Sequence, residues 1–367
     1  MTVGIVGAGQ LGRMVALAGY PLGQRFVFLD PAADACAGQI GPLINAPYDD
    51  EAALAELAQR TEVVTFEFEN VPSHAVESLA RQVLVYPLPD TLEIAQDRLH
   101  EKQLFGELGI ATASYEAVDS LEELRTAADN LGYPALLKTR RLGYDGKGQS
   151  LLRGASDVEA VWNTLGGVPL ILEAFVDFER ELSLVAARSR DGTMACYPLS
   201  ENEHRGGILR VSKSCHDVRF QAAGEAIAEA VMRRLDYVGV LAIEFFQSGE
   251  ELIANEMAPR VHNSGHWTIE GAETSQFENH LRAILGLPLG STAARGCAAM
   301  VNFVGRLPDI ATVTALPHVH FHDYGKAPRA GRKVGHATIA CTDPKHADEV
   351  LTRLVALSDA CSRGELE

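Results

Sequence analysis

Two glutamates in an apolar hairpin offer the clearest chemistry in this sequence. Glu244 and Glu256 lie in "GVLAIEFFQSGEELIANEMAP", which reads as two strands joined by a short turn. A three-residue loop would set these two carboxylates opposite each other, and Phe246 opposite Ala254. Like charges opposed across a ribbon repel, so we expect a cation between them rather than two solvated side chains. Mg²⁺ prefers such oxygen ligands together with phosphate and water, and Asn255 adds a further oxygen.

A glycine-rich loop precedes this hairpin, in "LLKTRRLGYDGKGQ". Lys138 stands at the end of an expected strand, and Lys147 lies among glycines in residues 143–149. Glycines let backbone N–H groups approach phosphate oxygens, and the lysines add positive charge. The spacing differs from that of a P-loop. The loop therefore favours phosphate binding, with a surface hairpin carrying solvated lysines as the alternative.

Two further clusters are typical of anion binding. "MAPRVHNSGHWT" places Arg260, His262, Asn263 and Ser264 within five positions, and an arginine there is suited to a phosphoryl group or an anionic substrate. Near the C-terminus, "YGKAPRAGRKVGH" gathers basic residues between glycines, which favours an anion pocket over a solubilising loop. The basic residues are Lys326, Arg329, Arg332 and Lys333.

A histidine-rich stretch, "HVHFH", could present three imidazoles on one face of a strand. These are His318, His320 and His322. No cysteine or carboxylate in a recognised zinc spacing accompanies them, so we do not predict a zinc site there.

The N-terminus carries a different signal. Residues 7–12, "GAGQLG", fit the dinucleotide fingerprint G-x-G-x-x-G, and Asp30 follows eighteen positions after Gly12. An NAD-dependent oxidoreductase is therefore one alternative. It would leave the glycine-rich loop and the glutamate pair without a role. Fluorescence quenching on addition of NADH would test it.

The composition narrows the class of protein. The chain has 367 residues and a formal net charge of −17, which argues against nucleic acid or an anionic membrane as the main partner. Its six cysteines form no C-x-x-C pair, as expected in a reducing cytoplasm. No stretch approaches the ~20 apolar residues of a membrane span. We expect a cytoplasmic enzyme.

The pattern of elements predicts a mixture of α/β and α+β structure. Residues 1–98 alternate strands and helices, as in a parallel, doubly wound sheet, and "YPLPD" marks a boundary. Residues 99–290 follow with strands around a glycine-rich loop, a helix near 219–235 and the hairpin. Residues 291–367 form a smaller α+β segment that packs on this core. Ser120 and Ser156 are expected to start helices with capping boxes.

Seven motifs, in order along the chain, resemble one family of ATP-grasp ligases. They are "GIVGAGQLGRM", "TFEFENV", "QDRLHEK", "KTRRLGYDGKGQ", "ENEHRGGIL", "NEMAPRVHNSGHWTIEGAETSQFENHLRAILGLPLG" and "YGKAPRAGRKVGH". The chain is similar to the 5-(carboxyamino)imidazole ribonucleotide synthases of purine biosynthesis. It departs at Val261, where the family usually has proline.

The resemblance implies an ATP-grasp fold. Its parts would be an N-terminal Rossmann-like (preATP-grasp) domain, a lid near 112–180 and a β-rich C-terminal part. It also implies carboxylation of 5-aminoimidazole ribonucleotide by ATP and bicarbonate, through carboxyphosphate, in a homodimer. The cofactors would be ATP and Mg²⁺. Another ATP-grasp ligase, such as a glycinamide ribonucleotide transformylase, and a regulator without catalysis are the remaining alternatives.

The resemblance also implies residue roles. Arg260, Lys147 and Lys138 would act in catalysis, Glu244 and Glu256 would bind the metal, and the glycine turn would face the ribonucleotide without binding nicotinamide. The implied ATP contacts are Arg98, Lys138, Gly143, Tyr144, Asp145, Gly146, Lys147, Gly148, Gln149, Glu173, Ala174, Phe175, Val176, Glu181, His204, Asn255 and Glu256. The implied ribonucleotide contacts are Gln10, Leu11, Glu69, Tyr144, Asp145, Arg260, His262, Asn263, Ser264, Lys326, Arg332 and Lys333.

Overall fold

The N-terminal part of the computed structural model is a parallel sheet with strand order β3-β2-β1-β4-β5. The model describes residues 1–143, 146–215 and 217–363. The strands are nearly continuous apolar runs because helices cover both faces of the sheet. The doubly wound prediction is confirmed. The elements are β1 (Thr2–Val6), α1 (Gln10–Gly19), β2 (Arg25–Asp30), β3 (Leu43–Asn45), α2 (Glu51–Arg60), β4 (Val63–Phe66), α3 (Ser73–Ala80), β5 (Leu84–Val85) and α4 (Pro89–Ala95).

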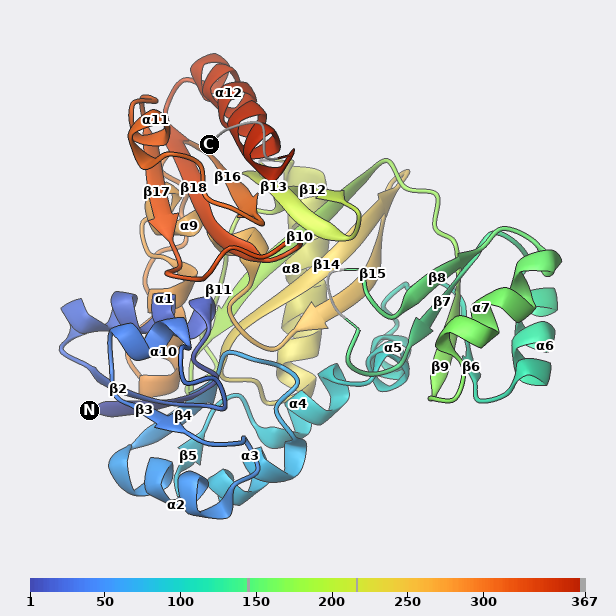
Figure 1. Cartoon of the computed structure of the whole chain (residues 1–367), viewed down its shortest axis with the longest axis horizontal. Coiled ribbons are helices and arrows are strands. Elements are labelled where there is room, and N and C mark those ends of the chain that lie inside the picture. The colour runs from blue at the N-terminus through green and yellow to red at the C-terminus, as the bar shows by residue number, and fades with distance from the viewer. Residues whose placement is uncertain (144–145, 216, 364–367) are drawn as a thin grey trace.

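A small antiparallel sheet, in the order β6-β9-β7-β8, forms the part that projects to the right in Figure 1. The hydroxyl of Ser120 caps α6 as predicted, accepting from the Glu123 N–H at 3.2 Å. The capping box at Ser156 is wrong, because a 3-10 turn precedes α7 and Asp157 bonds back to Arg153 instead. The elements are α5 (Arg98–Glu107), β6 (Tyr115–Val118), α6 (Leu121–Leu131), β7 (Ala135–Thr139), β8 (Gln149–Leu152), α7 (Val158–Leu165) and β9 (Leu170–Ala174).

The largest sheet runs in the order β15-β14-β10-β12-β13-β16-β18-β17, with β11 also paired to β10. The C-terminal strands enter this sheet because β16 pairs with β13. The elements are β10 (Arg180–Arg188), β11 (Met194–Cys196), β12 (Ser200–Arg205), β13 (Ile208–Ser214), α8 (Val218–Arg234), β14 (Gly239–Ser248), β15 (Glu251–Ala258), α9 (Thr268–Gly271), α10 (Gln276–Leu285), β16 (Cys297–Val304), α11 (Ile310–Thr314), β17 (Val319–Asp323), β18 (Lys333–Cys341) and α12 (Pro344–Arg363).

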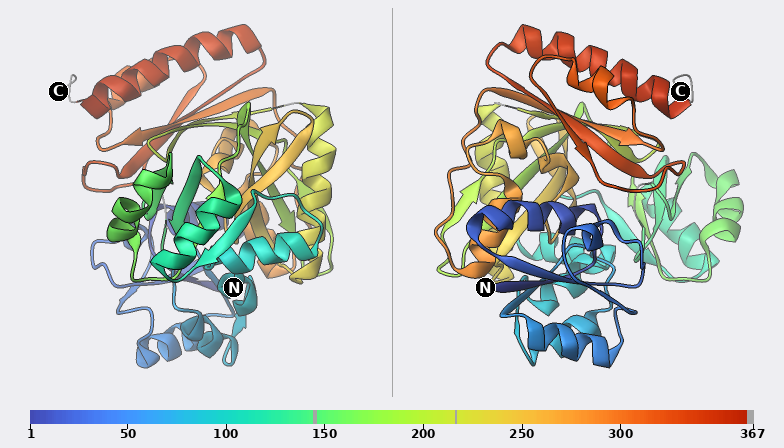
Figure 2. Two further views of the ribbon diagram at one scale, coloured as in Figure 1. Left: turned by 90° about the vertical axis from the view of Figure 1, so that its right-hand side faces the viewer. Right: turned by 60° about the vertical axis from the view of Figure 1, so that its left-hand side comes forward.

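Helix packing holds the N-terminal sheet against the large one. Helix α1 lies on α10, and Gly19 allows this approach, since a Cβ there would come within 2.8 Å of Leu281. The hydroxyl of Thr65 and Nε2 of His280 form a buried hydrogen bond of 2.9 Å between β4 and α10. At the opposite end, α12 lies across the C-terminal strands (Figure 2). Within the described residues, no helix combines the length and the apolar character needed to cross a membrane.

Candidate active site

A cavity of about 950 Å³ lies where the three parts of the molecule meet. Its walls come from the glycine turn, the loop after β7, strands β12 to β15 and the loop between β17 and β18. These segments are distant in sequence, so the fold gathers the separate clusters into one site. The predicted site residues that line the cavity are Gln10, Leu11, Glu69, Arg98, Gly143, Lys147, His204, Glu244, Glu256, Arg260, His262, Asn263, Lys326, Arg332 and Lys333.

Other predicted residues stand behind or beside this cavity. They are Lys138, Gly146, Gly148, Gln149, Glu173, Ala174, Phe175, Val176, Glu181, Asn255 and Ser264. Tyr144 and Asp145 lie outside the described residues.

Glu244 and Glu256 face each other across the β14–β15 ribbon, as predicted. The expected pairing of Phe246 with Ala254 is wrong, because Phe245 takes that position. The turn has two residues rather than three. A β-bulge between Glu244 and Phe245 then shifts the register by one residue and restores the opposition of the two carboxylates.

The bulge leaves Asn255 as the extra residue beside the pair of carboxylates. Its side-chain Oδ1 is buried and has no hydrogen-bond partner among the described residues. Burial, and then the charge of Glu256, raise the pKa of Glu244. Burial opposes ionisation of Glu256, but Arg98, 2.8 Å away, holds the pKa of Glu256 below its ordinary value. Glu256 thus has a close counter-charge, whereas Glu244 has no arginine paired with it in the same way within the described part of the chain.

This donor set fits Mg²⁺. Glu244 and Glu256 offer carboxylate oxygens and Asn255 an amide oxygen, and the residues described include no group of three or more histidine, cysteine or acidic side chains that could hold a metal by themselves. Mg²⁺ commonly takes one or two carboxylates and keeps phosphate and water as its other ligands. The buried Oδ1 of Asn255 is a further acceptor that a cation would satisfy.

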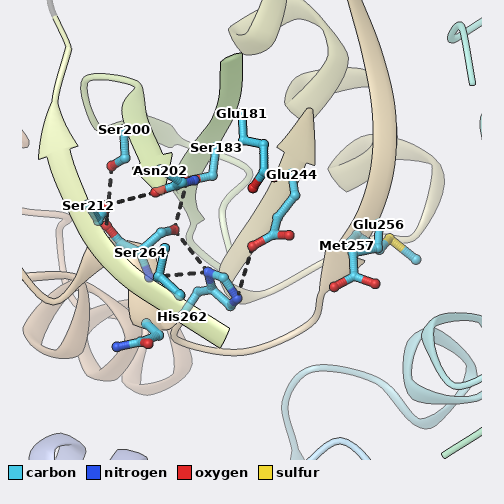
Figure 3. Close-up of polar contacts among 12 residues, drawn as sticks. Glu181, Ser183, Ser200, Asn202, Ser212, Glu244, Glu256, Met257, His262 and Ser264 are labelled. Atoms are coloured by element: carbon cyan, nitrogen blue, oxygen red, sulfur yellow. Dashed lines mark hydrogen bonds and ion pairs between the residues drawn. The ribbon is translucent and has the colours of Figure 1, made fainter. Parts of the chain in front are cut away.

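The segment after β15 adds two groups to the same wall. Arg260 pairs with Glu69 at 2.9 Å, which joins the large sheet to the N-terminal part. His262 Nε2 lies 3.6 Å from Glu244 Oε1 (Figure 3). Burial and the nearby Arg260 lower the pKa of His262 to about 3, so the ring is neutral near pH 7. Ser264 is fully buried behind this ring and does not reach the cavity.

The basic loop from the C-terminal segment closes the cavity against the glycine turn. Lys326 donates to the side chain of Gln10, and Gln39 donates to the Gly325 carbonyl at 3.2 Å. Arg329, Arg332 and Lys333 line the same region. Four cations of one loop thus line the cavity, which suits it to an anionic group.

The glycine turn itself is filled by a side chain of the protein. Glu67 accepts hydrogen bonds from the N–H groups of Gly9 at 2.9 Å and Gly12 at 3.3 Å. Asp30 accepts from the N–H of Ala8 at 2.8 Å. The amides that bind pyrophosphate in a dinucleotide site are therefore already bonded to carboxylates. This arrangement disfavours the NAD alternative.

Buried charges hold the strand that ends at the glycine-rich loop. Lys138 Nζ lies 3.0 Å and Lys102 Nζ 3.3 Å from Glu173 Oε2. Burial lowers the pKa of Lys138 despite this carboxylate. Nearby, Arg140 donates two hydrogen bonds to Asp97, at 2.9 and 2.8 Å. These contacts fix the base of the loop that carries Lys147.

Three family models match successive stretches of the chain. Residues 1–96 match the ribonucleotide synthetase preATP-grasp domain, residues 103–277 the ATP-grasp domain, and residues 298–350 the phosphoribosylaminoimidazole carboxylase C-terminal domain. The N5-carboxyaminoimidazole ribonucleotide synthase of Pseudomonas aeruginosa is 54% identical over 98% of this chain and 100% of its own length.

The chain belongs to the N5-carboxyaminoimidazole ribonucleotide synthase family.

Solved structures of this synthase family agree with that assignment. The enzyme from Thermus thermophilus is 55% identical, with a TM-score of 0.93 over 97% of this chain and 98% of its own. The enzyme from Aspergillus clavatus, solved with ADP and 5-aminoimidazole ribonucleotide, is 29% identical, with a TM-score of 0.90 over 98% of both chains. The predicted resemblance and the predicted ATP-grasp fold are confirmed.

Sequence reasoning missed several residues of this synthase-family site. Glu101 and Lys102 follow Arg98 by three and four positions, so all three share one face of α5. That spacing was a usable signal. Glu67 precedes Glu69 by two positions in the motif "TFEFENV", so the two side chains would lie on the same side of an extended segment. Arg140 offered no comparable signal.

The histidines of "HVHFH" have other partners. His322 Nε2 lies 2.7 Å from Glu270 and the ring stacks on His336 at 4.3 Å. His318 precedes β17 and approaches His346 at 5.5 Å instead. The three imidazoles are therefore not gathered into one site.

Proposed function

We infer that this chain catalyses the ATP-dependent carboxylation of 5-aminoimidazole ribonucleotide by bicarbonate in purine biosynthesis. The products are N5-carboxyaminoimidazole ribonucleotide, ADP and phosphate. One observation carries the proposal beyond family membership. The carboxylate pair Glu244 and Glu256 and the basic loop line the same cavity. A metal–nucleotide site and an anion site are thereby joined in a single chamber.

The nucleotide end of the cavity lies near the glycine-rich loop. Arg98, Lys138 and the loop 143–149 bind the phosphates in this proposal, and Glu173 to Val176 contact the base. Glu181, which contacts His204 directly, binds the ribose hydroxyls in this proposal. Glu244 and Glu256, with Asn255 beside them, hold Mg²⁺, which when bound withdraws charge from the ATP phosphates.

The ribonucleotide occupies the other end. Its phosphate binds Lys326, Arg332 and Lys333, since three cations there match a dianion. The ring and ribose contacts come from the glycine turn and the segment after β15. These contact residues are Gln10, Leu11, Glu69, Arg260, His262 and Asn263.

Two bond exchanges complete the reaction. A bicarbonate oxygen attacks the γ-phosphorus of ATP, forming carboxyphosphate as the bond to ADP breaks. The exocyclic amine of the ribonucleotide then attacks the carboxyl carbon, the bond from that carbon to the phosphate oxygen breaks, and the departing phosphate takes up the proton that the amine loses. Arg260, Lys138 and Lys147 neutralise the charge on the transferring group. The site must exclude water during the reaction, because water would hydrolyse the intermediate before its capture.

We further propose the division into domains at 1–98, 99–290 with a lid at 112–180, and 291–367, in a cytoplasmic homodimer. Light scattering coupled to size-exclusion chromatography measures the mass in solution. A mass equal to one chain would refute the dimer.

ADP release tests the reaction directly. We expect release to require 5-aminoimidazole ribonucleotide, Mg²⁺ and bicarbonate together. Release that persists at full rate after bicarbonate is removed would refute carboxylation and point to another ATP-grasp ligase.

A further inference from the structure

One face of the large sheet carries buried polar side chains directly behind the cavity (Figure 3). Ser183 on β10 pairs in register with Glu244 on β14, and Asn202 on β12 pairs with Ser212 on β13. Ser183 and Ser212 are fully buried, and Asn202 is nearly so. Buried polar groups are costly unless they are hydrogen-bonded, so the direction of each bond here is constrained.

One end of this network has a fixed donor. Trp267 Nε1 can only donate, and it donates to Ser200 Oγ at 2.8 Å. The Ser200 hydroxyl in turn donates to the Ser264 carbonyl at 3.2 Å. Ser212 Oγ lies 2.9 Å from the same carbonyl, which has a second lone pair, and 2.8 Å from Asn202 Oδ1, because Asn202 turns its oxygen toward Ser212.

The rest of the chain of bonds follows from this orientation of Asn202. With its oxygen toward Ser212, Asn202 donates from its amide nitrogen to Ser183 Oγ at 2.9 Å. Ser183 donates to Ser264 Oγ at 2.7 Å. Ser264 Oγ lies 2.9 Å from Nδ1 of His262 and has its own proton left to give. We call Asn202, Ser183 and Ser264 the hydroxyl relay.

The backbone of Ser264 reaches the same ring nitrogen. Its N–H donates to Nδ1 of His262 at 3.3 Å. A backbone amide keeps its proton, so Nδ1 must be an acceptor. In the neutral ring the proton then sits on Nε2, which lies 3.6 Å from Glu244 Oε1.

We propose that the hydroxyl relay is a positioning device that holds His262 with its proton on Nε2. His262 then presents an N–H donor toward Glu244 at the cavity wall and does not act as a general base. Ser264, expected from the sequence to contact the ribonucleotide, becomes a positioning residue. The inference rests on the proposed function only in naming the reaction that the Nε2 donor serves. The position of the proton on the ring does not depend on it.

The first test measures the ring itself and needs no turnover. Protein labelled with ¹⁵N-histidine is compared with the His262→Gln variant to assign the signal of His262. At pH 7, without nucleotide, we expect protonated Nε2 and unprotonated Nδ1. A ring protonated on Nδ1 would overturn the proposal. Loss of ADP release in the wild type would refute the proposed function and leave this measurement valid.

The second test separates hydrogen bonding from packing in the relay. Ser183→Cys and Ser264→Cys keep nearly the same shape but replace a hydroxyl with a weak donor. We expect kcat to fall about tenfold, with KM for ATP unchanged, since one hydrogen bond is worth about a factor of ten. Ser214→Cys is the matched control, because Ser214 bonds to the backbone of Ala298 instead. Relay variants as active as this control would overturn the proposal.

The third test distinguishes a donor from a base at His262. The amide nitrogen of His262→Gln can donate from a similar position, whereas His262→Leu cannot donate. We expect the glutamine variant to be at least about tenfold more active than the leucine variant. Equal activity of the two variants would indicate a base and overturn the proposal. Thermal melting checks that both fold.

Discussion

The buried acid Glu101 gives the prediction with the most definite magnitude. Glu101 is 2% exposed, and its Oε1 accepts from the Met257 N–H at 2.5 Å. Burial, and then the neighbouring charge of Glu256, raise the pKa of Glu101 to about 8. Glu101 is therefore protonated in the folded protein at pH 7, before any nucleotide binds. Glutamine at this position imitates the protonated acid.

The sign of the pH dependence follows from these values. The unfolded chain releases the proton of Glu101 near its ordinary pKa of 4.5, whereas the folded protein keeps it until about pH 8. Between these values the folded state binds more protons, so this group lowers stability as pH rises, and the full penalty applies above pH 8. The difference in pKa corresponds to a penalty on the order of 5 kcal/mol.

Thermal melting of nucleotide-free protein measures this penalty. Glu101→Gln should melt close to wild type at pH 5 and about 6 °C higher at pH 9, taking an unfolding entropy of about 2 cal/mol/K per residue. Glu107→Gln, an exposed position on the same helix, is the control and should follow wild type at both values. Parallel melting temperatures for wild type and Glu101→Gln across this range would show that Glu101 is ionised in the folded protein.

Three other substitutions test the site. Lys326→Ala should raise KM for the ribonucleotide about 10-fold or more and KM for ATP much less, because one charged hydrogen bond to the ribonucleotide phosphate is lost. Equal rises of the two KM values in steady-state kinetics would contradict the assignment of Lys326 to that phosphate. Glu256→Gln should lower kcat by about 100-fold at saturating Mg²⁺. Glu251→Gln, at the far end of the ribbon, is the control and should keep normal activity. Normal turnover of Glu256→Gln would show that Glu256 is not a metal ligand. Gly9→Ala should destabilise the protein by about 1–3 kcal/mol in urea unfolding, because the new Cβ would lie 2.8 Å from Oε1 of Glu67. In the Glu67→Ala background the same substitution should cost nothing, and an equal cost in both backgrounds would refute the steric argument.

The hairpin shows how far local pattern reaches. Apolar neighbours and a short turn were enough to predict that Glu244 and Glu256 oppose each other. The prediction used the wrong turn length and no bulge, and these two errors cancelled. Nothing in "IANEM" marks Asn255 as the unpaired residue, because a bulge is decided by contacts of both strands. The pair was predictable, whereas the orientation of Asn255 was not.

Contacts between distant segments could not be predicted from the sequence. Lys326 was recognised as part of an anion pocket, but its contact with Gln10 joins positions 316 residues apart. Ser264 was assigned to the ribonucleotide because it adjoins His262, yet only the sheet behind it reveals its bonds to Ser183. Residue type and spacing were enough to identify the charged groups of the cavity. Which of the neighbouring residues line the cavity depends on how they are buried in the fold.

The glycine turn explains how a dinucleotide fingerprint can occur in this family. The glycines of the motif are needed where another group approaches the backbone closely, and here that group is the side chain of Glu67. A Cβ at Gly7 would lie 2.8 Å from its Cγ, and one at Gly12 would lie 3.3 Å from it. The close approach that the fingerprint allows is therefore kept, but the approaching group is a side-chain carboxyl of the protein itself. Since Glu67 bonds the amides that would otherwise bind pyrophosphate, the same turn supports a ribonucleotide cavity and opposes a dinucleotide.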